Sequence, residues 1–139
     1  MTPGRPPLKT GDAMSDGTIY AGISPEDGKP MYTTPEDAPR AYNFNDARYY
    51  AANLEALGWT DWRIPTQNEL SVLWANRARG SLKGTFNEKG RSNSGWYWSF
   101  TAATERLPNF PGALVRRFSD GYVDCFNKVV PLSLRCVRT

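Results

Sequence analysis

Residues 96–138 carry the pattern that most restricts how this chain can fold. They contain four strand-like runs and one turn: WYWSF at 96–100, LVRRF at 114–118, Asp120-Gly121, YVDCF at 122–126 and SLRCVR at 133–138. An Asp-Gly pair between apolar runs indicates a tight hairpin, because both residues tolerate the left-handed backbone of such a turn. The pattern predicts an antiparallel meander closed by the 133–138 run, an arrangement that favours binding over catalysis.

Two helices are predicted before the meander. Apolar residues follow helical spacing over 44–57, with Asn43 or Asn45 as the N-cap. The segment WRIPTQNEL then supplies a T-x-x-E capping box for a second helix over 66–78. All five tryptophans lie between residues 59 and 98, which predicts an aromatic core around this part of the chain.

The first half of the chain predicts one more hairpin. GTIYAGI at 17–23 and KPMYT at 29–33 are β-type runs on either side of the turn sequence SPEDG. The polar, glycine-punctuated residues 79–95 are expected to form a long surface loop. Together these elements predict an α+β fold with two helices, antiparallel strands and long irregular loops.

The chain length of 139 residues allows one domain with a core of its own. Residues 1–14, rich in proline and glycine, are expected to be a disordered leader, a linker from a larger parent or a vector-derived remnant, and residues 15–139 the folded domain. No run of 18 apolar residues and no signal-peptide core occurs in the sequence, so no membrane insertion is expected.

Histidine is absent from the sequence, which removes the commonest metal ligand and the usual general base at neutral pH. Cys125 and Cys136 form no C-x-x-C motif; a bridge between them is geometrically conceivable, and free thiols are favoured. Asp120 and Asp124 are better explained by a hairpin than by a cation site. We therefore expect no cofactor, no metal and no catalytic residues.

Charge divides unevenly between the two halves. Residues 1–62 carry five Lys or Arg and nine acids, whereas residues 63–139 carry twelve and five. The basic half fits an anionic glycan, nucleic acid or an acidic protein surface. Charge simply spread over the surface is favoured, because no basic run of five residues exists and the arginines alternate with apolar residues. Nucleic acid is not expected as a partner.

Apolar residues in irregular segments are the candidate binding residues, because exposed aromatic and aliphatic anchors are typical of protein-binding surfaces. Strand alternation places Tyr122, Asp124 and Phe126 on one face, which the carboxylate of Asp124 predicts to be exposed. The complete candidate set is Phe100, Ala102, Ala103, Thr104, Arg106, Leu107, Pro108, Phe110, Leu114, Arg116, Tyr122, Asp124, Phe126, Val129 and Val130.

Four segments carry a family resemblance: GWTDWRIPTQNEL, GWYWSF, RRFSDG and SLRCVR. In this order and at these spacings they resemble the collagen-like adhesin C-terminal domain family, a bacterial and phage group within the C-type-lectin-like fold. The resemblance covers roughly residues 17–138. It implies a compact C-type-lectin-like domain with neighbouring terminal strands and an irregular binding face on its later strands and loops.

The same fold includes the variable proteins of diversity-generating retroelements, in which mutagenesis of adenines rewrites C-terminal binding residues. Rewritten asparagine-type codons do not yield Trp, Lys, Gln, Glu or Met, and residues 99–139 contain only Glu105 and Lys128 from that set. Uneven composition explains the same observation. The resemblance implies a protein ligand or cell-surface receptor as partner and leaves open a phage particle, the cell surface or the cytoplasm as location.

Departures from related patterns define the alternatives. Calcium-dependent lectins of this fold use E-P-N or Q-P-D triplets, which this sequence lacks. Formylglycine-generating enzymes share a segment like WRIPTQNEL, but Cys125 and Cys136 do not match their close cysteine pair. We therefore expect a non-catalytic binding domain; the alternatives are an adhesin that binds anionic glycans through Arg106, Arg116 and Arg117, and a relative of the formylglycine-generating enzymes.

Overall fold

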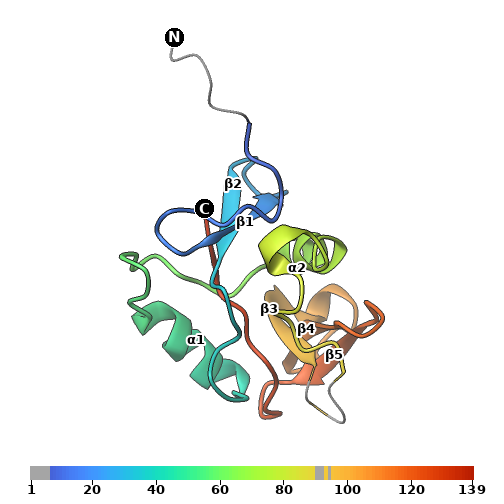
Figure 1. Ribbon diagram of the computed structural model, residues 1–139. Coiled ribbons are helices and arrows are strands. Elements are labelled where there is room, and N and C mark those ends of the chain that lie inside the picture. The colour runs from blue at the N-terminus through green and yellow to red at the C-terminus, as the bar shows by residue number, and fades with distance from the viewer. Residues whose placement is uncertain (1–6, 90–92, 94) are drawn as a thin grey trace.

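The computed structural model describes residues 7–89, 93 and 95–139, and it confirms an α+β fold. Two helices accompany two small antiparallel sheets of three strands each (Figure 1). The main elements are β1 (Ile19–Ile23), β2 (Pro30–Thr33), α1 (Phe44–Asn53), α2 (Gln67–Ala75), β3 (Trp96–Ala102), β4 (Gly112–Arg117), β5 (Val123–Asn127) and β6 (Val137–Arg138). Neither helix is long and apolar enough to cross a membrane.

The first sheet has the strand order β1-β2-β6. The predicted hairpin between β1 and β2 is confirmed, with Tyr20 opposite Tyr32. Residues before β1 extend this sheet, since the Gly11 N–H donates to the Tyr20 carbonyl and Ala13 bridges Ile19. The last strand, β6, pairs with β2.

The second sheet is the predicted meander, with the order β3-β4-β5. Val115 lies opposite Trp98 on one side and Asp124 on the other. The expectation that the 133–138 run closes this sheet was wrong. Ser133 forms hydrogen bonds with the backbones of Trp96 and Trp98, but the end of the run, Val137 and Arg138, pairs with β2 in the other sheet. The apolar side chains of the run belong to the two core clusters.

Both helices begin where the sequence predicts. Asn43 caps α1 by accepting from the Asp46 N–H, and Thr66 and Glu69 form the complete capping box of α2. Each helix ends earlier than predicted. In α1 the reason is a small bridge between Ala56 and Trp59, which takes residues 54–57 out of helical conformation.

Two apolar clusters form the core. One lies between α1 and the second sheet and includes Trp62, Trp96 and Trp98. The other lies around α2 and includes Leu70 and Leu73. The predicted aromatic core is therefore present, although Trp59 remains 38% exposed.

Residues 79–95 do not form a purely surface loop. Gly80–Leu82 form one 3-10 turn, and both Leu82 and Phe86 are buried against the core around α2. Phe86 contacts Phe118 with tilted rings whose centroids are 4.9 Å apart. The loop therefore anchors itself with two apolar side chains, a feature that its polar composition concealed. Residues 90–92 and 94 lie outside the described part of the chain.

A buried ion pair joins three distant segments. Arg135 is fully buried, and its Nε donates to Asp37 at 3.0 Å. The other Asp37 oxygen accepts from the Tyr97 hydroxyl at 2.5 Å. Burial raises the pKa of Asp37, and the opposing charge of Arg135 limits that rise. Through its two hydrogen bonds, Asp37 connects the loop after β2 to β3 and to the segment before β6.

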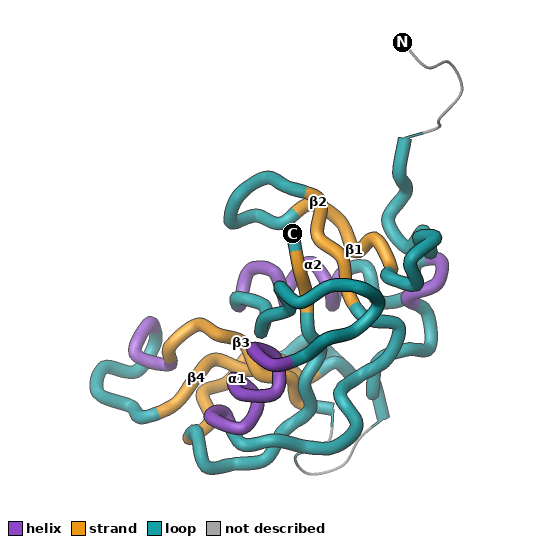
Figure 2. The backbone as a smooth tube through the Cα atoms, turned by 90° about the vertical axis from the view of Figure 1, so that its left-hand side faces the viewer, coloured by secondary structure: helices purple, strands orange, loops and turns teal. Residues whose placement is uncertain are grey.

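The two sheets lie at opposite ends of the molecule. The segment after β5 runs between α1 and the second sheet and brings the C-terminus beside β2, and the view turned by 90° shows the same separation (Figures 1 and 2). Side chains hold the short last strand. Arg138 pairs with both carboxylate oxygens of Asp61, at 2.7 and 3.0 Å, and stacks on Trp59 at 3.5 Å from the ring centroid.

Candidate ligand-binding face

The turn between β4 and β5 presents an exposed aromatic residue beside a cation. Tyr122 is 56% exposed and meets the edge of Trp96, with ring centroids 6.1 Å apart. The guanidinium of Arg117 lies 5.0 Å from the Trp96 ring and 5.4 Å from the Tyr122 ring. Asp120 fixes Arg117 through two hydrogen bonds of 2.9 and 2.6 Å, so the cation and both rings form a rigid group.

Asp120 belongs to this turn, as the sequence predicted. Its Oδ1 also accepts from the Tyr122 N–H. The hydrogen bonds from Arg117 and from that N–H lower the pKa of Asp120 to about 2. Gly121 has a φ of +81°, and a Cβ there would lie 2.6 Å from the Trp74 ring, so this turn position requires glycine.

The alternation predicted for β5 is present, but the exposure predicted for Phe126 was wrong. Tyr122 and Phe126 both contact Trp96, which places them on the same side. That side faces the cluster around α1, because Phe126 contacts Trp96 with ring centroids 4.9 Å apart and packs against that core. Asp124 is half-buried as well, and its Oδ1 accepts from the Cys125 N–H at 2.7 Å.

The other end of the second sheet carries a second exposed aromatic residue. Phe100 is 54% exposed and stacks on Phe44, with centroids 6.0 Å apart. Lys128 places its Nζ 4.7 Å from the Phe44 centroid, and its carbonyl accepts from the Phe44 N–H. Val129, next in the chain, is 75% exposed.

Aromatic residues gather at both ends of this face. Tyr122 and Phe126 contact Trp96 at one end, and Phe100 stacks on Phe44 at the other. We call these five residues the aromatic strip; of them only Tyr122 and Phe100 are mostly exposed. Arg117 lies over the first end of the strip and Lys128 over the second. The middle of the strip belongs to the core around α1, so the exposed rings rest on a rigid base.

The remaining candidates divide by burial. Ala103 and Leu114 are buried and are therefore unavailable for direct contact in this conformation. Phe110 and Val130 are half-buried. The exposed members of the candidate set lie mainly at the end of β3 and in the connection to β4: Ala102, Thr104, Arg106, Leu107 and Pro108.

The arginines of this region differ in their partners. Arg117 has Asp120, but none of the ion pairs within the described residues involves Arg106 or Arg116. Arg116 donates to the Gly121 carbonyl, and its Nε is buried without a hydrogen-bond acceptor. Burial and then repulsion from Arg106 lower the pKa of Arg116. From the sequence, these three arginines formed one set of candidates for binding an anionic glycan. In the described part of the structure Arg117 is in an ion pair, whereas Arg106 and Arg116 are not.

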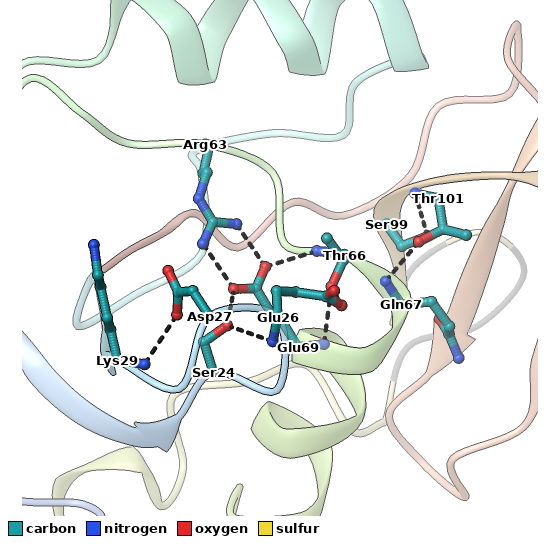
Figure 3. Close-up of polar contacts among 10 residues, drawn as sticks. All are labelled: Ser24, Glu26, Asp27, Lys29, Arg63, Thr66, Gln67, Glu69, Ser99 and Thr101. Carbon is teal, nitrogen blue, oxygen red and sulfur yellow. Dashed lines mark hydrogen bonds and ion pairs between the residues drawn. The ribbon is translucent and has the colours of Figure 1, made fainter.

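A buried carboxylate supports the segment that leads into α2 (Figure 3). Glu69 is fully buried and accepts two hydrogen bonds from Arg63, at 2.5 and 2.7 Å, and one from Ser24 at 2.7 Å. Burial alone would raise the pKa of Glu69, but the bonds from Arg63, the Thr66 N–H and Ser24 hold it below its usual range. Sequence reasoning found the capping box and missed that the same glutamate binds Arg63, six residues earlier.

The two thiols of the chain are free. Cys136 is buried, which raises its pKa to about 12. Cys125 is half-buried on β5, opposite Leu114. Within the residues that the structure describes, no three histidine, cysteine or acidic side chains are grouped so that they could hold a metal ion.

Comparison with known proteins identifies a family. The family model described as the Lcl C-terminal domain matches residues 24–138, which includes both sheets from β2 onward, both helices and the whole candidate set. No curated protein matches the chain.

Proposed function

The chain belongs to the Lcl C-terminal domain family, and from this premise we propose that it is a non-catalytic receptor-recognition domain that binds a protein ligand. Membership of this family supports a binding or adhesin-type domain. The observation that carries the proposal is the aromatic strip, whose exposed ends, Tyr122 and Phe100, rest on buried rings and lie beside Arg117 and Lys128. Aromatic side chains and arginine on a rigid base are the typical anchors of protein interfaces.

We further propose that the domain has the C-type-lectin-like fold and that its exposed loop residues vary. Two observations support this: the last strand pairs with the early strand β2, and the exposed candidates lie in connections rather than in the core. Loops on a sheet can change sequence without opening the core. The neighbouring DNA tests the retroelement part, because diversification requires a reverse transcriptase gene beside a near-copy of the 3′ end.

The lack of catalysis is part of the proposal. The carboxylate of Glu69 is enclosed by Arg63, Ser24 and Thr66, so it is not available as a general base. The raised pKa of Cys136 keeps that thiol protonated at neutral pH. These features speak against a relative of the formylglycine-generating enzymes.

An anionic-glycan adhesin is the second candidate, supported by Arg106 and Arg116. Neither makes an ion pair within the described residues, and the buried Arg116 Nε has no acceptor. A sulfate or carboxylate group could accept from the exposed guanidinium of Arg106. A salt titration separates the two candidates, because ion pairs of a glycan complex weaken steeply with ionic strength and a mainly apolar protein interface changes little.

Arrays of purified cell-surface proteins and of sulfated and unsulfated glycans provide the experiment. We expect the native domain to bind protein targets, and a variant with Phe100, Leu107, Tyr122 and Val129 changed to serine to lose that binding while its melting temperature stays within a few degrees. These side chains are exposed, so their loss leaves the core intact. The matched control changes Ile23, Tyr49 and Leu57, exposed elsewhere, to serine. Equal loss in both variants, or binding to sulfated glycans alone, would contradict the proposal.

A further inference from the structure

A groove lies under the exposed ring of Phe100, between α1 and the segment that leads into α2. Its walls and floor are mostly apolar and include Ala51, Ala52, Trp62 and Ile64 beside Phe100, and its volume is about 410 Å³. This volume falls within the range of pockets that hold a small ligand or a large side chain.

Small side chains on α1 create the groove. Ala51 and Ala52 line it at adjacent positions of the helix, and Ala52 is exposed. On the opposite wall, Trp62 and Ile64 belong to the buried core, so their positions are fixed. A larger side chain at position 52 would occupy the groove without disturbing that core.

One unpaired cation lines the groove. Arg48 lies one turn after Phe44 on the same helix, and helical side chains lean toward the N-terminus, which directs Arg48 toward the stacked rings of Phe44 and Phe100. Arg48 takes part in no ion pair within the described residues.

The second cation of the lining is not free. Arg63 also lines the groove, but its guanidinium is directed away from α1 and is bound by Glu69 (Figure 3). Thr66, beside Phe100 in the lining, already donates its hydroxyl hydrogen bond to the Glu26 carboxylate at 2.7 Å. Arg48 is therefore the lining cation that a ligand carboxylate can bind without displacing a carboxylate of this chain.

We propose that this groove anchors an apolar side chain of a protein partner and that an acidic residue next to that side chain binds Arg48. The inference rests on the proposed function, because Phe100 belongs both to the groove and to the aromatic strip. It identifies the partner segment by its chemistry: one aromatic or branched aliphatic side chain flanked by a carboxylate. Charge complementarity places that carboxylate beside Arg48, on the α1 side of the groove.

Three capped tripeptides test this chemistry. The first is glutamate–phenylalanine–glutamate, the second replaces both glutamates with glutamine, and the third replaces phenylalanine with alanine. In titrations followed by proton–nitrogen correlation spectra of the labelled domain, we expect the first peptide to shift the amide signals of residues 48–52, 64 and 100 in a saturable way. The other two peptides should bind more weakly, because each lacks one of the two recognised groups.

Matched variants assign the effect to the groove. Arg48→Gln should weaken the first peptide about two- to fivefold, as expected for one exposed ion pair, and should not change the affinity for the glutamine peptide. Ala52→Phe should remove the saturable shifts. The controls are Arg79→Gln and Ala75→Phe, exposed positions on the other helix and after it, which should bind like the native domain.

Two outcomes overturn the inference: equal affinity for all three peptides, or unchanged binding by the folded Ala52→Phe variant. These outcomes are distinct from failure of the proposed function. If the protein arrays show binding that Tyr122→Ser removes and Ala52→Phe leaves intact, the receptor-recognition function stands and the groove is not its anchor.

Discussion

Glu69 shows how much of this domain can depend on one side chain. Its carboxylate closes the capping box of α2, binds Arg63 and accepts from Ser24, so it joins the start of the helix to the loop after β1. The Arg63 side chain is 38% exposed, whereas that of Glu69 is inaccessible. Replacing Glu69 therefore leaves several donors without an acceptor, while replacing Arg63 leaves a buried charge.

The pH dependence of stability should reveal this role. The pKa of Glu69 is lowered in the folded state, so its stabilising effect is complete above the unfolded pKa of about 4.3 and disappears as pH falls toward the folded value. We expect Glu69→Gln to reduce the free energy of unfolding by about 1–3 kcal/mol at pH 7. The difference from the native protein should shrink below about pH 4.5.

Thermal melts of both proteins from pH 3 to pH 8 provide the measurement. Asp16, Asp61 and Asp120 also have lowered pKa values, but they are present in both proteins and cancel in the difference. A gap in stability that stays constant down to pH 3 would show that the ionised form of Glu69 contributes nothing.

At the scale of elements, the starts of helices were predictable and their ends were not. A capping side chain acts within three residues, so Asn43 and Thr66 are visible in the sequence. The end of α1 depends on the bridge between Ala56 and Trp59, and the partner of β6 depends on packing between two sheets. Phe126 on the candidate face is a further example. Strand alternation predicts which side of β5 its side chain occupies, but it does not predict that the core around α1 covers that side.

The start of α2 gives a prediction about an element. The Thr66 hydroxyl accepts from the Glu69 N–H at 3.2 Å, so Thr66→Ala should destabilise the domain by about 1 kcal/mol. Thr66→Ser keeps the hydroxyl and should cost less. Urea unfolding measures the stability of both variants. An alanine variant as stable as the serine variant would show that the Thr66 hydroxyl does not stabilise α2.

At the scale of the whole molecule, the chain's own contacts account for its stability. Two apolar clusters and the buried pair of Asp37 and Arg135 connect both sheets. We therefore expect a chelator to leave the melting temperature unchanged and added calcium to leave it unchanged as well, because the described residues offer no group of carboxylates with the number of oxygens that calcium takes. A reproducible rise in melting temperature with calcium, but not with magnesium, would disprove this expectation.

The last strand has a mechanical consequence. If the domain were held through its C-terminus while a ligand pulled on the second sheet, the load would pass through β6, which pairs with β2 over only two residues. The contacts of Arg138 with Asp61 and Trp59 would then resist the separation of β6 from β2. We expect Arg138→Ala to lower the force needed to unfold single molecules that are pulled through the C-terminus. The same variant should bind a ligand of the second sheet with nearly unchanged affinity.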